Sequence, residues 1–124
     1  EVKVADTPLA RAWFGERGDF LAFHWHGETF SLPPGAERLL SSAHCQNQAY
    51  VLGGRHLGMQ CHVEMTADMV RVWCRDGAGE IAASATSPGV QSGDAMLEHL
   101  EQRTGALNAV ADSVYGRWIE GLAR

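Results

Sequence analysis

The hydrophobic pattern of this sequence changes its period near residue 66, and this change restricts the folds open to the chain. Before that point, short apolar runs alternate with turn residues, which is typical of β-strands. After it, apolar residues recur at every third or fourth position, which is typical of amphipathic helices. We therefore expect one domain with a β-rich segment over residues 1–65 and a helical segment over residues 66–124.

The β-rich segment carries signals for strands, one short helix and a hairpin. Thr7 before Pro8 predicts the start of a helix over residues 9–14, because a capping side chain and an N-terminal proline favour a first helical turn. Gly53 and Gly54 predict a tight hairpin turn, since both residues can take positive φ. Strands are predicted over residues 1–4, 20–25, 38–42, 49–52 and 56–62.

The helical segment begins with a clear capping signal. Thr66 followed by Asp68 predicts a helix start, with Met69, Val70 and Trp73 on the buried face. We expect a loop with one helical turn over residues 77–93.

Two more helices are expected after this loop. The first begins near Met96 and is broken near Gly105. The second is a closing amphipathic helix whose apolar stripe predicts core packing rather than a binding face. This stripe comprises Leu107, Val110, Val114, Trp118 and Leu122.

Charge and cysteine usage narrow the class of protein. The ten basic residues are scattered among fifteen acidic ones, and the net charge of -5 disfavours nucleic-acid binding. The sequence holds no run of ~18 apolar residues, so no membrane span is predicted. The odd count of three cysteines, without CxxC spacing, disfavours a disulfide scaffold and favours a cytoplasmic protein.

His62 and Glu64 form the strongest candidate for chemistry. Side chains at i and i+2 of an extended strand point to the same side, so this imidazole and carboxylate can face one site. A carboxylate beside an imidazole fixes its tautomer, which is the arrangement of a general base with its orienting partner. A surface ion pair at a strand end is an equally good interpretation of the spacing.

The three cysteines are weak candidates for a nucleophile. Cys61 neighbours His62, but alternation along a strand points them to opposite faces. Cys45 lacks the following glycine of a nucleophile elbow, and Cys74 lies in a predicted helix. We expect all three to be small buried hydrophobes.

A metal site is a further alternative. His24, His26 and Glu28 could join His62 and Glu64 in a zinc or iron site. Their spacing is shorter than the cupin pattern requires. The simpler interpretation is that one histidine packs against the neighbouring indole and the other is hydrogen-bonded in a turn.

Four segments in order resemble the C-terminal half of class I (triad-type) glutamine amidotransferases. They are Phe-His-Trp-His-Gly-Glu-Thr-Phe at 23–30, Leu-Pro-Pro-Gly at 32–35, Cys-Gln-Asn-Gln-Ala-Tyr at 45–50 and Gly-Met-Gln-Cys-His-Val-Glu at 58–64. The branch most similar is that of stand-alone bacterial proteins resembling the amidotransferase domain of GMP synthase. The resemblance implies an α/β, flavodoxin-like three-layer fold, of which this chain supplies several strands, a β-hairpin and the C-terminal helices.

The resemblance also implies hydrolysis of the side-chain amide of L-glutamine by a Cys-His-Glu triad. His62 would be the general base and acid, and Glu64 its orienting carboxylate. No cofactor and no metal are implied, and the ammonia would pass to an unknown acceptor or synthase. The residues implied at the glutamine pocket are Asn47, Gln48, Ala49, Tyr50 and His26.

Two departures from the family pattern limit this expectation. Cys61 and Val63 stand where the family has phenylalanine and proline, and loss of the proline relaxes the turn that presents Glu64. The family's Gly-x-Cys-x-Gly elbow is absent from this sequence, which also begins with Glu1 rather than methionine. We therefore expect a fragment that cannot hydrolyse glutamine alone and that self-associates through an exposed sheet edge. A non-catalytic binding or assembly module is the alternative.

Overall fold

A single antiparallel sheet organises the computed structural model, which describes residues 1–122. Its strand order is β1-β2-β3-β4, so that each strand pairs with its neighbour in sequence. β4 therefore forms one edge of the sheet. The strands are β1 (Val2–Val4), β2 (Glu37–Ser42), β3 (Ala49–Leu52) and β4 (His56–Met59).

The hairpin between β3 and β4 follows the sequence prediction. Gly53 and Gly54 have φ of 60° and 74°, a region that costs glycine little. Leu52 pairs with His56, so three residues make the turn. β4 then ends at Met59, earlier than predicted.

The predicted strand over residues 20–25 is wrong. Phe20 forms an isolated bridge with Val2, and Phe23 forms another with His62. These partners belong to opposite sides of the sheet, β1 and the segment that follows β4. The segment crosses between them, so it builds no continuous ladder with either.

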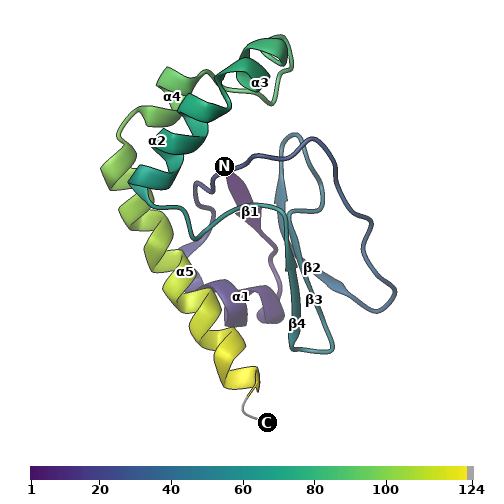
Figure 1. Ribbon diagram of the computed structural model, residues 1–124. Coiled ribbons are helices and arrows are strands. Elements are labelled where there is room, and N and C mark those ends of the chain that lie inside the picture. Colours follow the sequence, from purple (N-terminus) through teal and green to yellow (C-terminus); the bar gives the residue numbers. More distant parts are fainter. Residues whose placement is uncertain (123–124) are drawn as a thin grey trace.

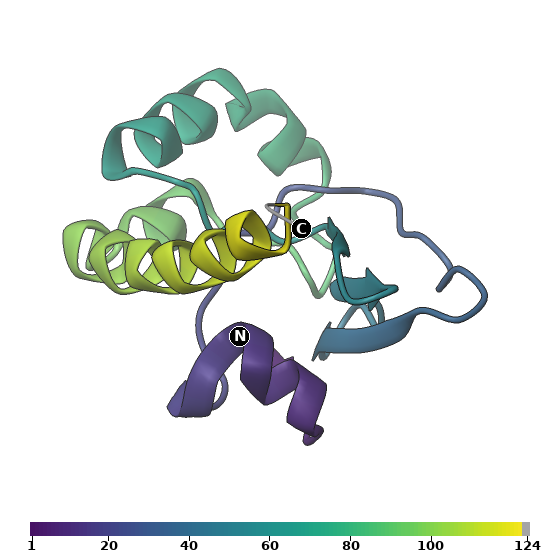
Figure 2. The same ribbon diagram turned by 90° about the horizontal axis from the view of Figure 1, so that it is seen from below.

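Helices α1 (Pro8–Phe14) and α5 (Leu100–Leu122) lie side by side and pack against the sheet (Figures 1 and 2). Thr7 caps α1 as predicted, since its hydroxyl accepts a hydrogen bond from the Ala10 amide at 3.1 Å. A 3-10 turn, η1 (Gly15–Arg17), follows. The core between sheet and helices includes Trp13, Phe14, Leu39, Leu40, Val63, Leu107, Val110 and Val114.

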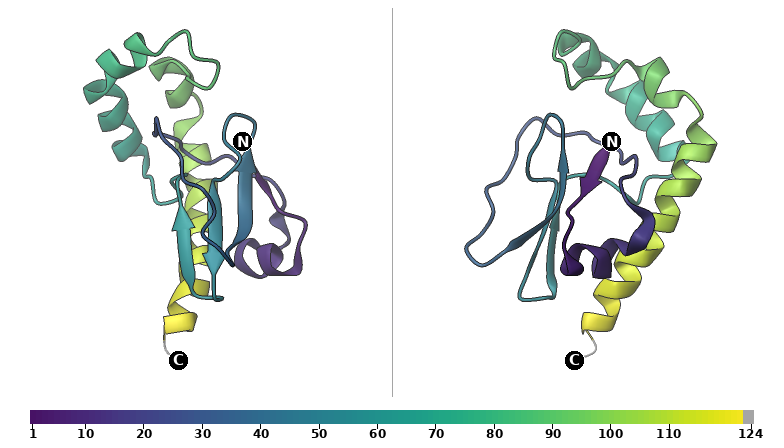
Figure 3. Two further views of the ribbon diagram at one scale, coloured as in Figure 1. Left: turned by 90° about the vertical axis from the view of Figure 1, so that its right-hand side faces the viewer. Right: turned by 180° about the vertical axis from the view of Figure 1, so that it is seen from behind.

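Helices α2 (Ala67–Asp76), α3 (Ala78–Ala83) and α4 (Gly93–Leu97) gather at one end of the molecule (Figures 1 and 3). Thr66 caps α2 as predicted, accepting from the Met69 amide at 3.3 Å. A second, smaller core joins α2 to the start of α5. It consists of Met65, Val70, Cys74 and Leu100.

One prediction for the last helices is wrong, and another is confirmed only in part. Gly105 lies inside α5, and the chain instead breaks at His99, whose φ is 51°. The apolar stripe of α5 is buried through Val114, but Trp118 and Leu122 are 39% and 56% exposed because α5 extends past the core. Within residues 1–122, no helix combines the length and the apolar character needed to cross a membrane.

Candidate active site

The segment between β4 and α2 carries His62 and Glu64, and its main chain is anchored by Phe23. The amide of Phe23 donates to the His62 carbonyl at 3.1 Å, and the amide of His62 donates to the Phe23 carbonyl at 2.8 Å. This bridge fixes the backbone at the candidate base although no regular strand continues to that point.

The side chains of His62 and Glu64 meet, as the i and i+2 spacing predicts. Nδ1 of His62 lies 2.7 Å from Oε1 of Glu64, and the two side chains are 27% and 39% exposed. A protonated Nδ1 donates to the carboxylate and leaves Nε2 as the nitrogen available for proton transfer. The geometry is that of an oriented imidazole.

The pKa of Glu64 lies below its usual value. Partial burial alone would raise the pKa, but hydrogen bonds from backbone amides and from His62 stabilise the carboxylate and outweigh this effect. Glu64 is therefore ionised at neutral pH. Its carboxylate supplies the negative charge that stabilises an imidazolium at His62.

His62 and Glu64 line a cleft of about 350 Å³ between β4 and the exposed end of α5. The apolar wall consists of Leu57, Met59, Cys61, Tyr115 and Trp118. Gln60 completes the cleft, so three polar residues at i, i+2 and i+4 share it.

Gln60 is a site residue to which the sequence interpretation gave no role. Its Nε2 donates to the Thr29 hydroxyl and to the Asn47 carbonyl, both at 2.6 Å. These bonds tie the segment of His62 to two loops that are distant in sequence. The alternation from Gln60 to Glu64 was the local signal that could have included it.

The two buried cysteines do not supply an activated thiol. Burial raises the pKa of Cys61 to about 12, and burial also raises the pKa of Cys74, which lies on α2. Cys45 is half-buried, and its sulfur contacts the Thr29 hydroxyl at 3.3 Å. Since the thiolate is the nucleophile, the protonated Cys61 beside His62 is unsuited to attack.

The residues that the resemblance places at the glutamine pocket do not line the cleft at His62, although the Asn47 carbonyl accepts from Gln60, which does. Gln48, just before β3, and Ala49, in β3, are both buried, and Tyr50 packs on the Phe30 ring at 5.1 Å between centroids. The Asn47 side chain accepts from Arg38 at 3.0 Å and donates to the Phe30 carbonyl at 3.0 Å. Their side chains therefore build the scaffold.

His26, the remaining predicted pocket residue, is hydrogen-bonded in its own loop. Its Nδ1 lies 2.9 Å from the Glu28 carbonyl oxygen, and its ring meets that of His24 at 6.1 Å between centroids. Burial, the N-terminal charge, His26 and His62 together lower the pKa of His24 to about 4. Among residues 1–122, no three His, Cys, Asp or Glu side chains gather closely enough to hold a metal ion.

Comparison with solved structures gives matches over nearly the whole chain. A glutamine amido transferase from Methylobacillus flagellatus matches with a TM-score of 0.93 and 44% identity, over 97% of this chain and 50% of that one. A glutamine amidotransferase (tm1158) from Thermotoga maritima matches with a TM-score of 0.75 and 30% identity, over 96% and 48%. SMU.1228c shares the fold, with a TM-score of 0.80 and 24% identity, over 95% and 50%.

The chain thus spans about half the length of each of these structures. Comparison with protein-family models gave no match, and comparison with curated proteins gave none.

Proposed function

Because the chain belongs to the class I glutamine amidotransferase family and spans about half the length of the members it matches, we propose that it carries half of a glutaminase site. His62 is the general base and acid, and Glu64 is the carboxylate that orients it. The observation that carries this proposal is the 2.7 Å contact between His62 Nδ1 and Glu64 Oε1 at the cleft.

In the proposed reaction, Nε2 of His62 removes the proton from a cysteine thiol. The thiolate attacks the side-chain amide carbon of L-glutamine, and the resulting tetrahedral intermediate collapses as His62 returns the proton to the leaving ammonia. Water, activated by the same imidazole, then hydrolyses the glutamyl thioester and releases glutamate and the free thiol. Glu64 stabilises the imidazolium in both halves of the reaction.

The nucleophile in this proposal comes from a polypeptide segment outside residues 1–124. The pKa of Cys61, near 12, argues against the thiol that is nearest to His62 in sequence. The matched structure from Methylobacillus flagellatus is about twice as long as this chain, so its other half could hold the nucleophile. The cleft opens beside the free edge of β4, where an added strand could bring the thiol to His62.

This function requires no cofactor or metal from the chain, and the acceptor of the ammonia lies with another domain or protein. Three free cysteines suit a reducing compartment such as the cytoplasm.

A chimera tests the proposal. The matched half of the Methylobacillus flagellatus protein is replaced by this chain, which has 44% identity to it. We expect ammonia release from glutamine by the chimera, loss of that release in His62→Ala, and retention in Val72→Ala, a change at an exposed site on α2.

Release of ammonia that survives His62→Ala would refute the assignment, as would a folded chimera that is inactive while its parent is active. The isolated chain should release no ammonia. Activity of the isolated chain that persists after replacement of all its cysteines would disprove the triad mechanism altogether.

A non-catalytic binding or assembly module is the second candidate. Val63 is fully buried in the core and stands where the resembled motif has proline. The segment between β4 and α2 therefore uses this position for core packing. A folded chimera that binds glutamine without hydrolysing it would favour this function over the first.

A further inference from the structure

The indole of Trp73 lies against the imidazole of His62. Their ring centroids are 5.3 Å apart, and the ring planes are inclined by 78°. Trp73 also meets Phe23 at 5.8 Å and Trp25 at 5.9 Å, both edge to face. It is therefore the residue through which α2 reaches the candidate base.

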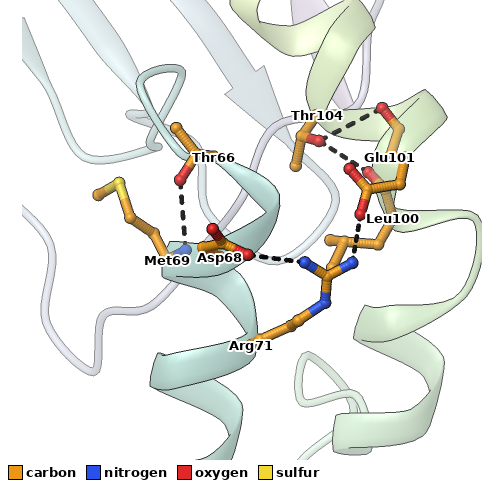
Figure 4. Close-up of polar contacts among 7 residues, drawn as sticks. All are labelled: Thr66, Asp68, Met69, Arg71, Leu100, Glu101 and Thr104. Atoms are coloured by element: carbon orange, nitrogen blue, oxygen red, sulfur yellow. Dashed lines mark hydrogen bonds and ion pairs between the residues drawn. The ribbon is translucent and has the colours of Figure 1, made fainter.

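Several contacts fix the position of Trp73. On α2, the neighbouring Val70 and Cys74 are buried in the small core shared with α5. On the outer side of the helix, Arg71 binds both Asp68 and Glu101, which joins α2 to the first turn of α5 (Figure 4). The indole thus projects from a helix that is attached at two points.

Trp25, a second aromatic neighbour of Trp73, is itself constrained. The indole of Trp25 donates to Glu80 of α3 at 3.1 Å, and it lies so close to Gly77 that a methyl group there would collide with it. Trp25 cannot move away from Trp73 without losing these contacts. Trp73 therefore packs against an indole that is held in place.

The imidazole needs this support because its other restraints are incomplete. The bridge to Phe23 fixes the main chain of His62 but leaves rotation about the side-chain bonds. The Phe23 ring also faces the imidazole, at 6.3 Å between centroids, but Trp73 is the nearer aromatic ring at 5.3 Å. The Glu64 contact joins two partly exposed groups, and such pairs are weak in water. A ring packed edge-on against the imidazole limits rotation that would carry Nδ1 away from the carboxylate.

We propose that Trp73 is a positioning residue for His62, holding the imidazole with Nδ1 toward Glu64 and Nε2 toward the cleft. This inference rests on the proposed role of His62 as the base. Trp73 itself touches neither substrate nor thiol, and it acts only through the orientation of the imidazole.

The tautomer of His62 in the isolated chain provides a direct test. In chain labelled with ¹⁵N-histidine, NMR of the neutral imidazole should show the Nδ1–H tautomer, with the signal assigned by His62→Gln. We expect Trp73→Phe and the control Val72→Ala to keep this tautomer. Trp73→Leu keeps an apolar side chain at this position but removes the planar aromatic ring. This variant should give a mixture of both tautomers.

Circular dichroism and melting temperature verify that each variant is folded. If Trp73→Leu is unfolded, Trp73→Met and Trp73→His replace it, and the same loss of tautomer preference is expected. A folded variant without an aromatic ring at position 73 that keeps the wild-type tautomer would overturn the proposal.

The active chimera gives a second readout. There Trp73→Leu should lower kcat by roughly 10- to 100-fold with KM little changed, because misplacement of a catalytic group affects the chemical step. An unchanged kcat would overturn the positioning role. An inactive chimera with Trp73 intact would instead refute the proposed function, while the NMR result would still decide the orientation of His62.

Discussion

Nδ1 of His62 lies 2.7 Å from Oε1 of Glu64 on a segment that belongs to neither a strand nor a helix. The ladder of β4 has already ended at Met59, so the sheet alone does not hold this pair in place. Contacts from Phe23, Trp73 and α5 replace the ladder. The stability of the site therefore depends on residues far from it in sequence.

Asn108 of α5 should stabilise the segment that carries the pair. Its Nδ2 donates to the Met65 carbonyl at 3.0 Å and reaches the Val63 carbonyl at 3.4 Å. Asn108→Ala leaves partly buried carbonyls without this donor, so we expect a loss of about 1–3 kcal/mol in the free energy of unfolding by urea denaturation. Asp112→Ala, on an exposed position of α5, is the control and should change little. Equal stability of the two variants would contradict the prediction.

His24 should make stability depend on pH. Its pKa of about 4 in the folded chain lies below the usual 6.5, chiefly because of burial. Between these two pH values the imidazole is protonated in the unfolded chain but neutral in the folded chain. This stability is present above about pH 6.5 and is lost as the pH falls toward 4.

We expect His24→Gln to reduce the fall in unfolding free energy between neutral pH and about pH 4.5 by roughly 1–2 kcal/mol, a figure lowered for partial solvent exposure. Urea denaturation at the two pH values measures it. Parallel pH profiles of the wild type and the variant would show that His24 does not titrate in this way.

Gly77 should tolerate no side chain. A Cβ there would collide with the Trp25 ring and would lie 2.9 Å from the Trp73 carbonyl oxygen, a backbone atom that cannot easily move. We expect Gly77→Ala to cost about 1–3 kcal/mol of stability by thermal or urea unfolding. Gly79→Ala is the matched control, because its Cβ meets open space on α3 and alanine favours the helix. A Gly77→Ala chain as stable as Gly79→Ala would be inconsistent with the packing.

The isolated chain should self-associate. Trp118 and Ile119 are 39% and 59% exposed on α5, and β4, which shares a cleft with Trp118, leaves an open sheet edge. Analytical ultracentrifugation should show association that rises with concentration and weakens in Trp118→Glu. Val72→Glu, at a residue of similar exposure on α2, should leave it unchanged. A wild-type chain that stays monomeric would count against the interpretation of the chain as part of a longer domain.

The local elements could be predicted because each depends on neighbours in sequence. Thr7 and Thr66 cap their helices through the amides three residues ahead, and Gly53 and Gly54 adopt the conformation that the hairpin needs. The error over residues 20–25 has a different origin, since an apolar run does not reveal which strands lie within reach of it. The predicted helix break near Gly105 is wrong for a similar reason. The packing of α5 offsets the small loss of helix stability that one glycine causes.

The sequence by itself indicated that His62 and Glu64 face one side, because the alternation of side chains along extended backbone depends only on their spacing. It also carried the order of motifs that indicated the family. Only the tertiary structure decided that Trp73 lies against His62, that Gln60 ties the same segment to Thr29, and that Trp118 remains exposed. The two contacts join residues that lie apart in the sequence, and the exposure of Trp118 depends on how far α5 extends past the core. All three arise only when the helices pack against the sheet and its connecting loops.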